Sequence, residues 1–220
     1  MKERIAQVHD RIAVACHRSR RDPEDVRLVA VTKKVPVERI REGVAHGLRD
    51  FGENYVQEAR AKISEFEKGP VWHLIGHLQA NKVKYVPVLF DYIHSVDRWE
   101  LLEQLDHYQK ALSVLFEINL SGETQKHGTT EEGLKPMLAR VGELKHVKPV
   151  GLMTVPPWSD NAEDSRRFFA ALRNLLDRVN NDYGLSMTEL SMGMSSDFDV
   201  AIEEGATMVR VGTAIFGERL

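Results

Sequence analysis

The chain has 220 residues, of which 42% are hydrophobic and 29% are charged, and its formal net charge at pH 7 is −3. This length suits one large domain or two small ones and is enough to bury a sizeable core. The charge balance does not favour a nucleic-acid partner, which needs a basic stripe, and no apolar run of about 18 residues predicts a membrane span.

The first segment of the sequence predicts an amphipathic helix. Residues 1–22, MKERIAQVHDRIAVACHRSRRD, carry apolar residues every three to four positions and lack the continuous apolar stretch of a signal peptide. The chain contains one cysteine, Cys16, so it forms no internal disulfide. Together these observations indicate a cytoplasmic protein.

Short apolar segments then alternate with amphipathic segments, several of which end in glycine as helices often do. The predicted strands are residues 27–32, 50–53, 71–76, 92–96, 113–120, 149–155, 189–193 and 207–212. Strands separated by helices of this length predict parallel βαβ units. Eight such units predict an α/β fold, a (β/α)8 TIM barrel formed as a single domain by residues 1–220, with an extra N-terminal helix. The alternative is an open doubly wound sheet.

The first predicted strand ends on two lysines, in the stretch LVAVTKKVP. A barrel places its chemistry at the C-terminal ends of its strands, so we expect Lys33 in the barrel mouth; the alternative is a solvated surface lysine. A lysine in a desolvated mouth readily loses its charge, and the neutral amine is the nucleophile of Schiff-base chemistry. Because side chains alternate along a strand, we expect Lys34 to point the other way. Pro36 is expected in the first turn of the next helix.

The last two predicted strands lead into glycine-containing turns, in SMGMSSDFDVAIEEG and TMVRVGTAIFGERL. Ser195 or Ser196 stands where a helix N-cap belongs, which indicates either plain capping or an anion site. Gly212 lets the backbone approach a ligand closely, and Thr213 adds a hydroxyl. TIM barrels often bind phosphate between the loops that follow strands seven and eight, so these turns predict a phosphate site.

Arg210 lies inside the apolar stretch MVRVG. A buried guanidinium must be paired or must serve a ligand, and Glu203 or Glu204 is the alternative structural partner. Strand one lies next to strand eight in a closed barrel, so Lys33, Arg210 and the phosphate site converge. They predict an aldehyde that carries a phosphate, which is either pyridoxal 5′-phosphate (PLP) or the phosphosugar of an aldolase.

Six ordered segments resemble one known family: AVTKKVP, FGENYVQEA, WHLIGHLQANK, GLMTV, LSMGMSSD and ATMVRVGTAIFG. They resemble the pyridoxal phosphate homeostasis proteins, which are relatives of the alanine racemase N-terminal barrel, over about residues 5–218. The resemblance implies PLP as cofactor, held as a Schiff base on Lys33, with Arg210 facing the pyridine nitrogen. It implies the following cofactor-binding residues and no certain catalytic residue: Lys33, Asn54, Ser195, Arg210, Gly212 and Thr213. The family's usual second lysine, two positions after the first, is replaced here by Val35.

The implied function is to hold PLP in intracellular PLP homeostasis without robust catalysis, because an arginine keeps the pyridine nitrogen unprotonated and makes the ring a weaker electron sink. The alternative is a PLP-dependent amino-acid racemase with weak activity. Alanine racemase also needs a second, β-rich domain whose tyrosine is the opposite base, and we expect none here. The implied partners are PLP and apo PLP-dependent enzymes, with no nucleic acid and no membrane, and the expected state is a monomer.

Three further side chains are candidates for a site. His73 and His77 have the i, i+4 spacing of a metal site on a helix, but their segment predicts a strand and turn, so we expect no metal. Trp158 follows TVPP and is a candidate for the wall of the mouth, although plain packing is the simpler interpretation.

Overall fold

The computed structural model of the protein describes residues 1–67, 69–123 and 125–218. Within these residues, eight parallel strands close into a barrel in chain order, and β8 pairs with β1. The predicted (β/α)8 barrel is confirmed, and the open-sheet alternative is wrong because the β1–β8 pairing leaves no sheet edge. The strands are β1 Arg27–Val31, β2 Asp50–Glu53, β3 Val71–Leu74, β4 Tyr92–Val96, β5 Leu112–Glu117, β6 Val147–Met153, β7 Glu189–Met194 and β8 Met208–Val211.

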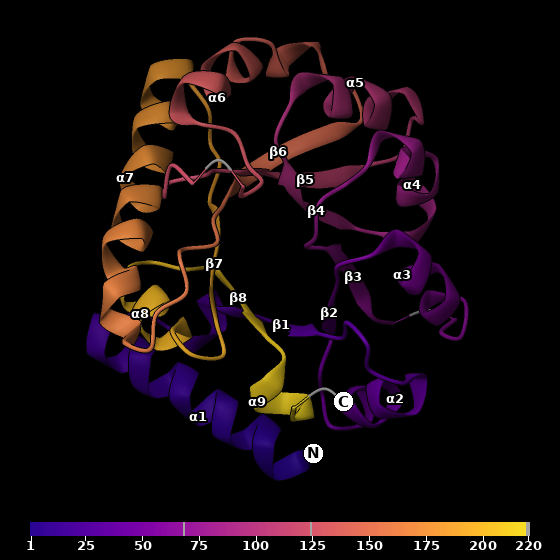
Figure 1. The fold of residues 1–220 in the computed structure, drawn as a ribbon, viewed down its shortest axis with the longest axis vertical. Helices are drawn as coiled ribbons and strands as arrows, with labels where there is room; N and C mark the ends of the chain where they lie inside the picture. Colours follow the sequence, from indigo (N-terminus) through magenta and orange to yellow (C-terminus); the bar gives the residue numbers. More distant parts are fainter. Residues whose placement is uncertain (68, 124, 219–220) are drawn as a thin grey trace.

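Helices surround the barrel, as Figure 1 shows. The α-helices are α1 Lys2–Ser19, α2 Val37–Ala45, α3 Val56–Ile63, α4 Val86–Leu89, α5 Trp99–His107, α6 Glu131–Leu138, α7 Arg166–Tyr183, α8 Phe198–Glu203 and α9 Thr213–Phe216. Short 3-10 helices are η1 Pro23–Asp25, η2 Ala80–Tyr85, η3 Val141–Glu143 and η4 Ala162–Ser165. The predicted N-terminal helix is α1, which lies beside α8 and α9.

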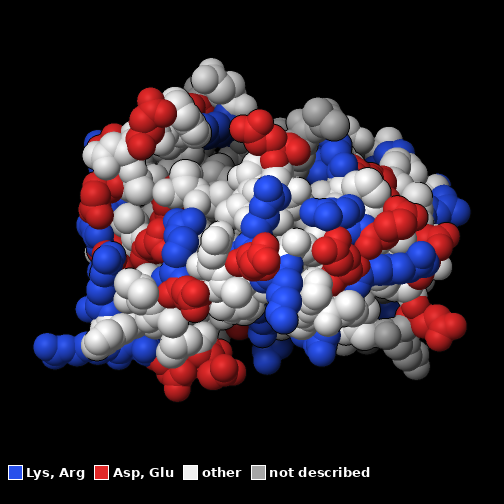
Figure 2. All heavy atoms as spheres, turned by 90° about the horizontal axis from the view of Figure 1, so that it is seen from below, with Lys and Arg blue, Asp and Glu red and all other residues white. Residues whose placement is uncertain are grey.

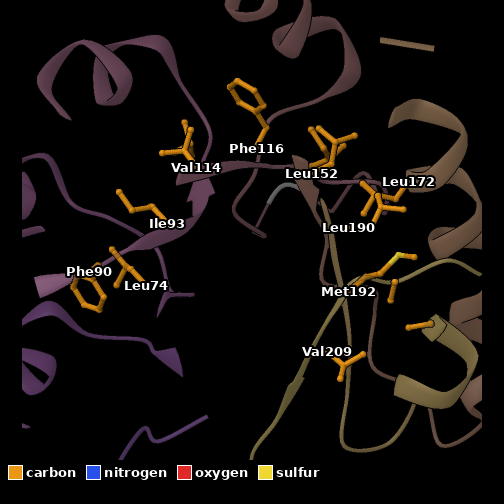
Figure 3. Close-up of a cluster of buried hydrophobic side chains, with 14 of the residues drawn as sticks. Leu74, Phe90, Ile93, Val114, Phe116, Leu152, Leu172, Leu190, Met192 and Val209 are labelled. Carbon is orange, nitrogen blue, oxygen red and sulfur yellow. The ribbon is translucent and has the colours of Figure 1, made fainter. Parts of the chain in front are cut away.

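Alternation along the strands separates an apolar outer layer from a partly polar interior. Leu74, Ile93, Leu190 and Val209 are buried and lie between the strands and the surrounding helices (Figure 3). Successive strand residues point to opposite faces, so the polar residues next to them in the sequence face the inside of the barrel. The main hydrophobic core is therefore the shell between strands and helices, and the interior has room for polar chemistry.

The first strand is one residue shorter than predicted. It ends at Val31, because Thr32 begins a turn that the hydrogen bond from Val35 N to Thr32 O closes at 2.9 Å. Helix α2 begins at Val37, so Pro36 is its N-cap and lies one residue before the predicted position. Both differences place the two lysines in a turn.

The surface mixes charges of both signs. On the face seen in Figure 2, Lys and Arg side chains are interspersed with Asp and Glu. Arg166, for example, pairs with Glu163, Glu203 and Glu204. None of the helices in the described part of the chain combines the length and the apolar character that crossing a bilayer requires.

Candidate functional site

A cavity of about 500 Å³ opens at the C-terminal ends of the strands, between the loops after β1, β2, β7 and β8. Its lining contains every residue that the sequence analysis selected: Lys33, Asn54, Ser195, Arg210, Gly212 and Thr213. The apolar lining comes from Val31, Ile75, Val155, Met194 and Trp158. None of the described residues that line the cavity is Asp or Glu, so it offers two cations and several hydrogen-bond donors without a carboxylate.

Lys33 reaches the cavity from the turn after β1. Its Nζ lies 5.1 Å from the centre of the Tyr55 ring, which is a cation–π contact. Lys34 is exposed and has a φ of 59°, in the left-handed region. The prediction that Lys34 points away from the mouth agrees with its exposure, but the reason given for it is wrong: a turn, and not strand alternation, separates the two side chains.

A buried ion-pair network supports this turn from below. Lys62, in α3, donates to Glu53 Oε1 at 2.8 Å and to Glu58 Oε1 at 2.7 Å, and it also donates to the backbone carbonyl of Thr32. Burial raises the pKa of Glu53, and the hydrogen bonds from Lys62 and Thr32 oppose that increase. Sequence reasoning missed Lys62, which holds the carbonyl of the residue before Lys33.

Asn54 follows β2 and packs against Gly76. A Cβ atom at Gly76 would lie 2.3 Å from the carbonyl oxygen of Asn54, so only glycine permits this approach. Asn54 also lines a second cavity of about 470 Å³, together with His77 and His127. The rings of these two histidines stack with centroids 4.0 Å apart, and burial followed by the charge of His127 lowers the pKa of His77.

The loop after β7 carries Ser195 and is held by Asp197. Asp197 Oδ1 accepts from Met194 N at 2.7 Å, and its Oδ2 accepts from Ser165 Oγ at 2.9 Å. Helix α8 begins at Phe198, so Asp197 is its N-cap residue and the prediction of a serine N-cap is wrong. The carboxylate closes the loop, and Ser195 lines the cavity.

The loop after β8 meets the loop after β7 at Ser195. Gly212 N and Ala214 N donate to Ser195 Oγ at 3.3 and 3.5 Å. From α1, Arg11 donates to the Ser195 backbone carbonyl at 3.4 Å and pairs with Asp199. The extra N-terminal helix therefore supports the serine that the sequence assigned to phosphate binding.

Arg210 is buried, with a relative exposure of 4%. Its Nη1 donates to Ser191 Oγ at 2.6 Å and its Nη2 to the Thr154 carbonyl at 2.9 Å. Burial lowers the pKa of Arg210 to about 10, so it remains charged at neutral pH. The alternative partners Glu203 and Glu204 instead pair with arginines of the outer helices.

Glu117, at the end of β5, is the buried carboxylate whose charge acts most strongly on Arg210. Burial raises the pKa of Glu117 to about 7, against the opposing attraction of Arg210. This carboxyl group therefore titrates near neutral pH. It lies outside the lining of the mouth cavity.

His73 and His77 do not share a site. His73 is fully buried and hydrogen-bonds to Asp50 and His94, whereas His77 lies outside the barrel interior beside His127. In the described residues, no cluster of three or more His, Cys, Asp or Glu side chains has the arrangement of a metal site.

Comparison with known proteins connects this geometry to a family. Residues 6–220 match the family described as "Alanine racemase, N-terminal domain". The chain is 44% identical to the pyridoxal phosphate homeostasis protein of Aquifex aeolicus, covering 99% of this chain and 97% of that protein. It is 40% identical to the protein of the same name from Escherichia coli K12, covering 98% and 95%.

Solved structures give the same result. The chain superposes on PipY of Synechococcus elongatus PCC7942 solved with PLP bound, with a TM-score of 0.86 and 38% identity, covering 98% of this chain and 99% of that one. An alanine racemase of Clostridium difficile, at 13% identity and a TM-score of 0.74, shares the fold alone, and the match covers 57% of that chain. The six segments, the barrel and the full-length similarity agree: the chain belongs to the pyridoxal phosphate homeostasis protein family, within the wider family of alanine racemase N-terminal domains.

Proposed function

We propose that this protein binds PLP in the mouth cavity and acts as a PLP carrier in PLP homeostasis. The observation that carries the proposal is the donor set of the cavity, which combines an amine, a guanidinium and hydroxyl groups with no carboxylate among the described lining residues. Such a set suits an anionic ligand with an aldehyde. Of the two phosphate-bearing aldehydes that the sequence predicts, family membership favours PLP.

Each lining residue would have a distinct task. Lys33 would supply the amine that binds the aldehyde, and Ser195, with the Gly212–Thr213 turn, would hold the phosphate. Arg210 would donate to the pyridine nitrogen, because a guanidinium has only donors. Asn54 and the apolar wall would fix the ring. When bound, PLP supplies an aldehyde that reacts with amines.

The cavity supports a carrier more strongly than a racemase. Racemisation needs a base on each face of the reacting carbon. Of the described residues that line the cavity, only Lys33 and Arg210 are titratable, and Arg210 stays charged because its pKa is about 10. The lining therefore offers a single base, Lys33.

The open rim of the cavity also bears on how PLP leaves the protein. Lys33 is partly exposed, and Trp158 at the rim is 79% exposed, so the cavity opens toward a partner. We infer that apo PLP-dependent enzymes receive the PLP, that the carrier works as a monomer, and that it works in the cytoplasm. The single cysteine, which excludes an internal disulfide, supports a reducing compartment.

The test is to add PLP to the purified protein, reduce with borohydride and map the modified peptide by mass spectrometry. We expect a new absorbance band and a PLP label on the peptide that contains Lys33. A companion assay with L-alanine should give no steady formation of D-alanine. A protein that gains neither band nor label contradicts PLP binding, and sustained racemisation contradicts the carrier role.

A further inference from the structure

A line of polar side chains crosses the inside of the barrel from Arg210 to Asp50. After the 2.6 Å hydrogen bond between Arg210 and Ser191, Ser191 Oγ lies 2.8 Å from His94 Nδ1. His94 Nε2 then lies 2.9 Å from His73 Nδ1, and His73 Nε2 lies 2.9 Å from Asp50 Oδ1. The strands β4 and β7 are not neighbours in the sheet, so the His94–Ser191 bond spans the interior.

The two end groups, Arg210 and Asp50, determine the direction in which this chain of hydrogen bonds donates. A carboxylate only accepts, so His73 carries its proton on Nε2, facing Asp50. If His73 is neutral, its Nδ1 accepts from His94 Nε2–H, and His94 Nδ1 must then accept from the Ser191 hydroxyl. Arg210 only donates, so Ser191 Oγ accepts from it. Every hydrogen bond then runs in one direction, from Arg210 toward Asp50.

Burial keeps both histidines neutral and so maintains this direction. His73, His94 and Ser191 each have a relative exposure of 0%. Burial lowers the pKa of both histidines, in His94 to well below its usual value, and the charge of Arg210 adds to the decrease in His94. A doubly protonated His73 would reverse the chain, because it would donate to His94 and move the His94 proton to Nδ1.

The chain gives Arg210 a partner that does not cancel its charge. The Ser191 hydroxyl proton is used by His94, so the serine oxygen presents only lone pairs to the guanidinium. Hydrogen bonds in series polarise one another, which makes that oxygen a better acceptor. The negative end, Asp50, is the first residue of β2 and also pairs with Arg27.

We propose that Ser191, His94 and His73 are positioning residues whose hydrogen-bond chain holds the Arg210 guanidinium in one orientation at the mouth cavity. The orientation of Arg210 is set by the protein itself and does not depend on bound PLP. The effect on cofactor binding rests on the proposed function.

The first test uses the protein without PLP. Nitrogen-15 NMR at neutral pH should show both His73 and His94 as neutral rings protonated at Nε2. It should also show a sharp Arg210 Nε–H signal, as expected of an immobile buried guanidinium. His94 protonated at Nδ1, or an Arg210 signal averaged by motion, would overturn the proposal.

The second test uses variants that cut the chain at chosen atoms. Ser191→Ala removes the acceptor of Arg210. An asparagine side chain reaches about as far as the Nδ1 position of histidine and a glutamine about as far as Nε2, so His94→Asn retains an acceptor for Ser191 and His94→Gln does not. Ser95→Ala is the matched control, since Ser95 is equally buried on β4 but donates to the Gly76 carbonyl.

We expect Ser191→Ala and His94→Gln to change the Arg210 signal, and His94→Asn and Ser95→Ala to retain it. In PLP titrations, the first two variants should bind about tenfold more weakly, as expected from the loss of one hydrogen bond to a charged group, with a shifted absorbance maximum. Unchanged Arg210 signals in folded Ser191→Ala protein would overturn the proposal. If the NMR results hold but the wild-type protein gains no PLP band, the chain is supported and the proposed function fails.

Discussion

Two buried cations lie beside the mouth cavity, and their surroundings differ sharply. On the β1–β2 side, Lys62 has a relative exposure of 7% and pairs with two carboxylates, Glu53 and Glu58. On the β7–β8 side, Arg210 has a relative exposure of 4%, and it donates hydrogen bonds to two neutral oxygens, from Ser191 and Thr154. One cation is neutralised locally, and the other keeps its charge beside the cavity.

We interpret this difference as one between a structural cation and a cation that serves the proposed ligand. A buried charge without a direct ion-pair partner costs several kcal/mol, so stability alone does not explain an arginine at this position. Lys62 stabilises the turn that carries Lys33. Arg210 lines the cavity itself, where an electron-rich ligand atom would complete its surroundings.

The largest effect, on PLP labelling, is expected at Lys33, whose side chain is not part of the Lys62 ion-pair network. Lys33→Ala should reduce the covalent PLP label, measured by intact mass after borohydride reduction, to the background. Lys34→Ala should keep the full label, because Lys34 lies outside the cavity lining. A label that persists in Lys33→Ala and maps to Lys62 would reverse the roles of the two lysines.

Lys62→Met should lower the free energy of unfolding by about 3–5 kcal/mol, because it leaves the buried Glu53 carboxylate without its partner. Urea unfolding at pH 7 measures this loss. The double variant with Glu53→Gln removes the uncompensated charge and should recover most of the stability. A loss below about 1 kcal/mol in the single variant would show that Lys62 is not the structural cation.

The pH dependence of stability tests Glu117, the carboxylate that interacts electrostatically with Arg210. Its pKa is raised from 4.5 to about 7, so the folded state binds the proton more tightly than the unfolded state. The contribution of Glu117 to the free energy of unfolding should therefore be largest below about pH 4.5 and should be lost as the pH rises through 7. The loss should amount to about 3 kcal/mol, at about 1.4 kcal/mol per pKa unit.

Glu117→Gln should remove that fall, measured as the difference between the unfolding free energies of the variant and the wild type from pH 5 to pH 8. The exposed Glu100→Gln serves as the control and should leave the pH dependence as it is in the wild type. If Glu117→Gln retains the wild-type curve, Glu117 does not titrate near neutral pH.

Arg210→Met should cost less stability than Lys62→Met, about 1–3 kcal/mol, because the hydrogen-bond acceptors that it leaves unpaired are neutral oxygens. The same urea unfolding compares the two variants directly. PLP titration of Arg210→Met should show weaker binding, which Lys62→Met should not match once the protein is folded. A stability loss in Arg210→Met equal to that in Lys62→Met would contradict the distinction between the two cations.

The sequence predicts the fold and the membership of the cavity well, for physical reasons. Strand and helix periodicity alternate eight times, and barrel closure then places the end of β1 beside β8. Lys33, Arg210 and Gly212 are therefore expected to meet without any knowledge of side-chain positions. Strand ends were less predictable, as at Thr32, because a local turn and not hydrophobicity determines where pairing stops.

Contacts across the barrel lay beyond sequence reasoning. The His94–Ser191 bond depends on which inward residues reach the same depth on opposite strands, and a register shift between Ser191 and Met194 affects that depth. Gly193, with φ of 89°, lies in this irregularity. A signal was present, since His73, His94 and Ser191 each interrupt an apolar strand, and a buried polar residue needs a partner.

Closure of β8 on β1 also has a consequence for biosynthesis. Lys33 is synthesised well before Ser195, Arg210 and Gly212, which follow it in the chain. If the site works as proposed, a nascent chain carries the amine long before it carries the phosphate-binding loops, and it binds the aldehyde efficiently only after β8 has paired with β1. Ligand at one hundred times its dissociation constant would then add about 2.7 kcal/mol to the stability of the closed barrel, so cofactor supply favours completion of the fold.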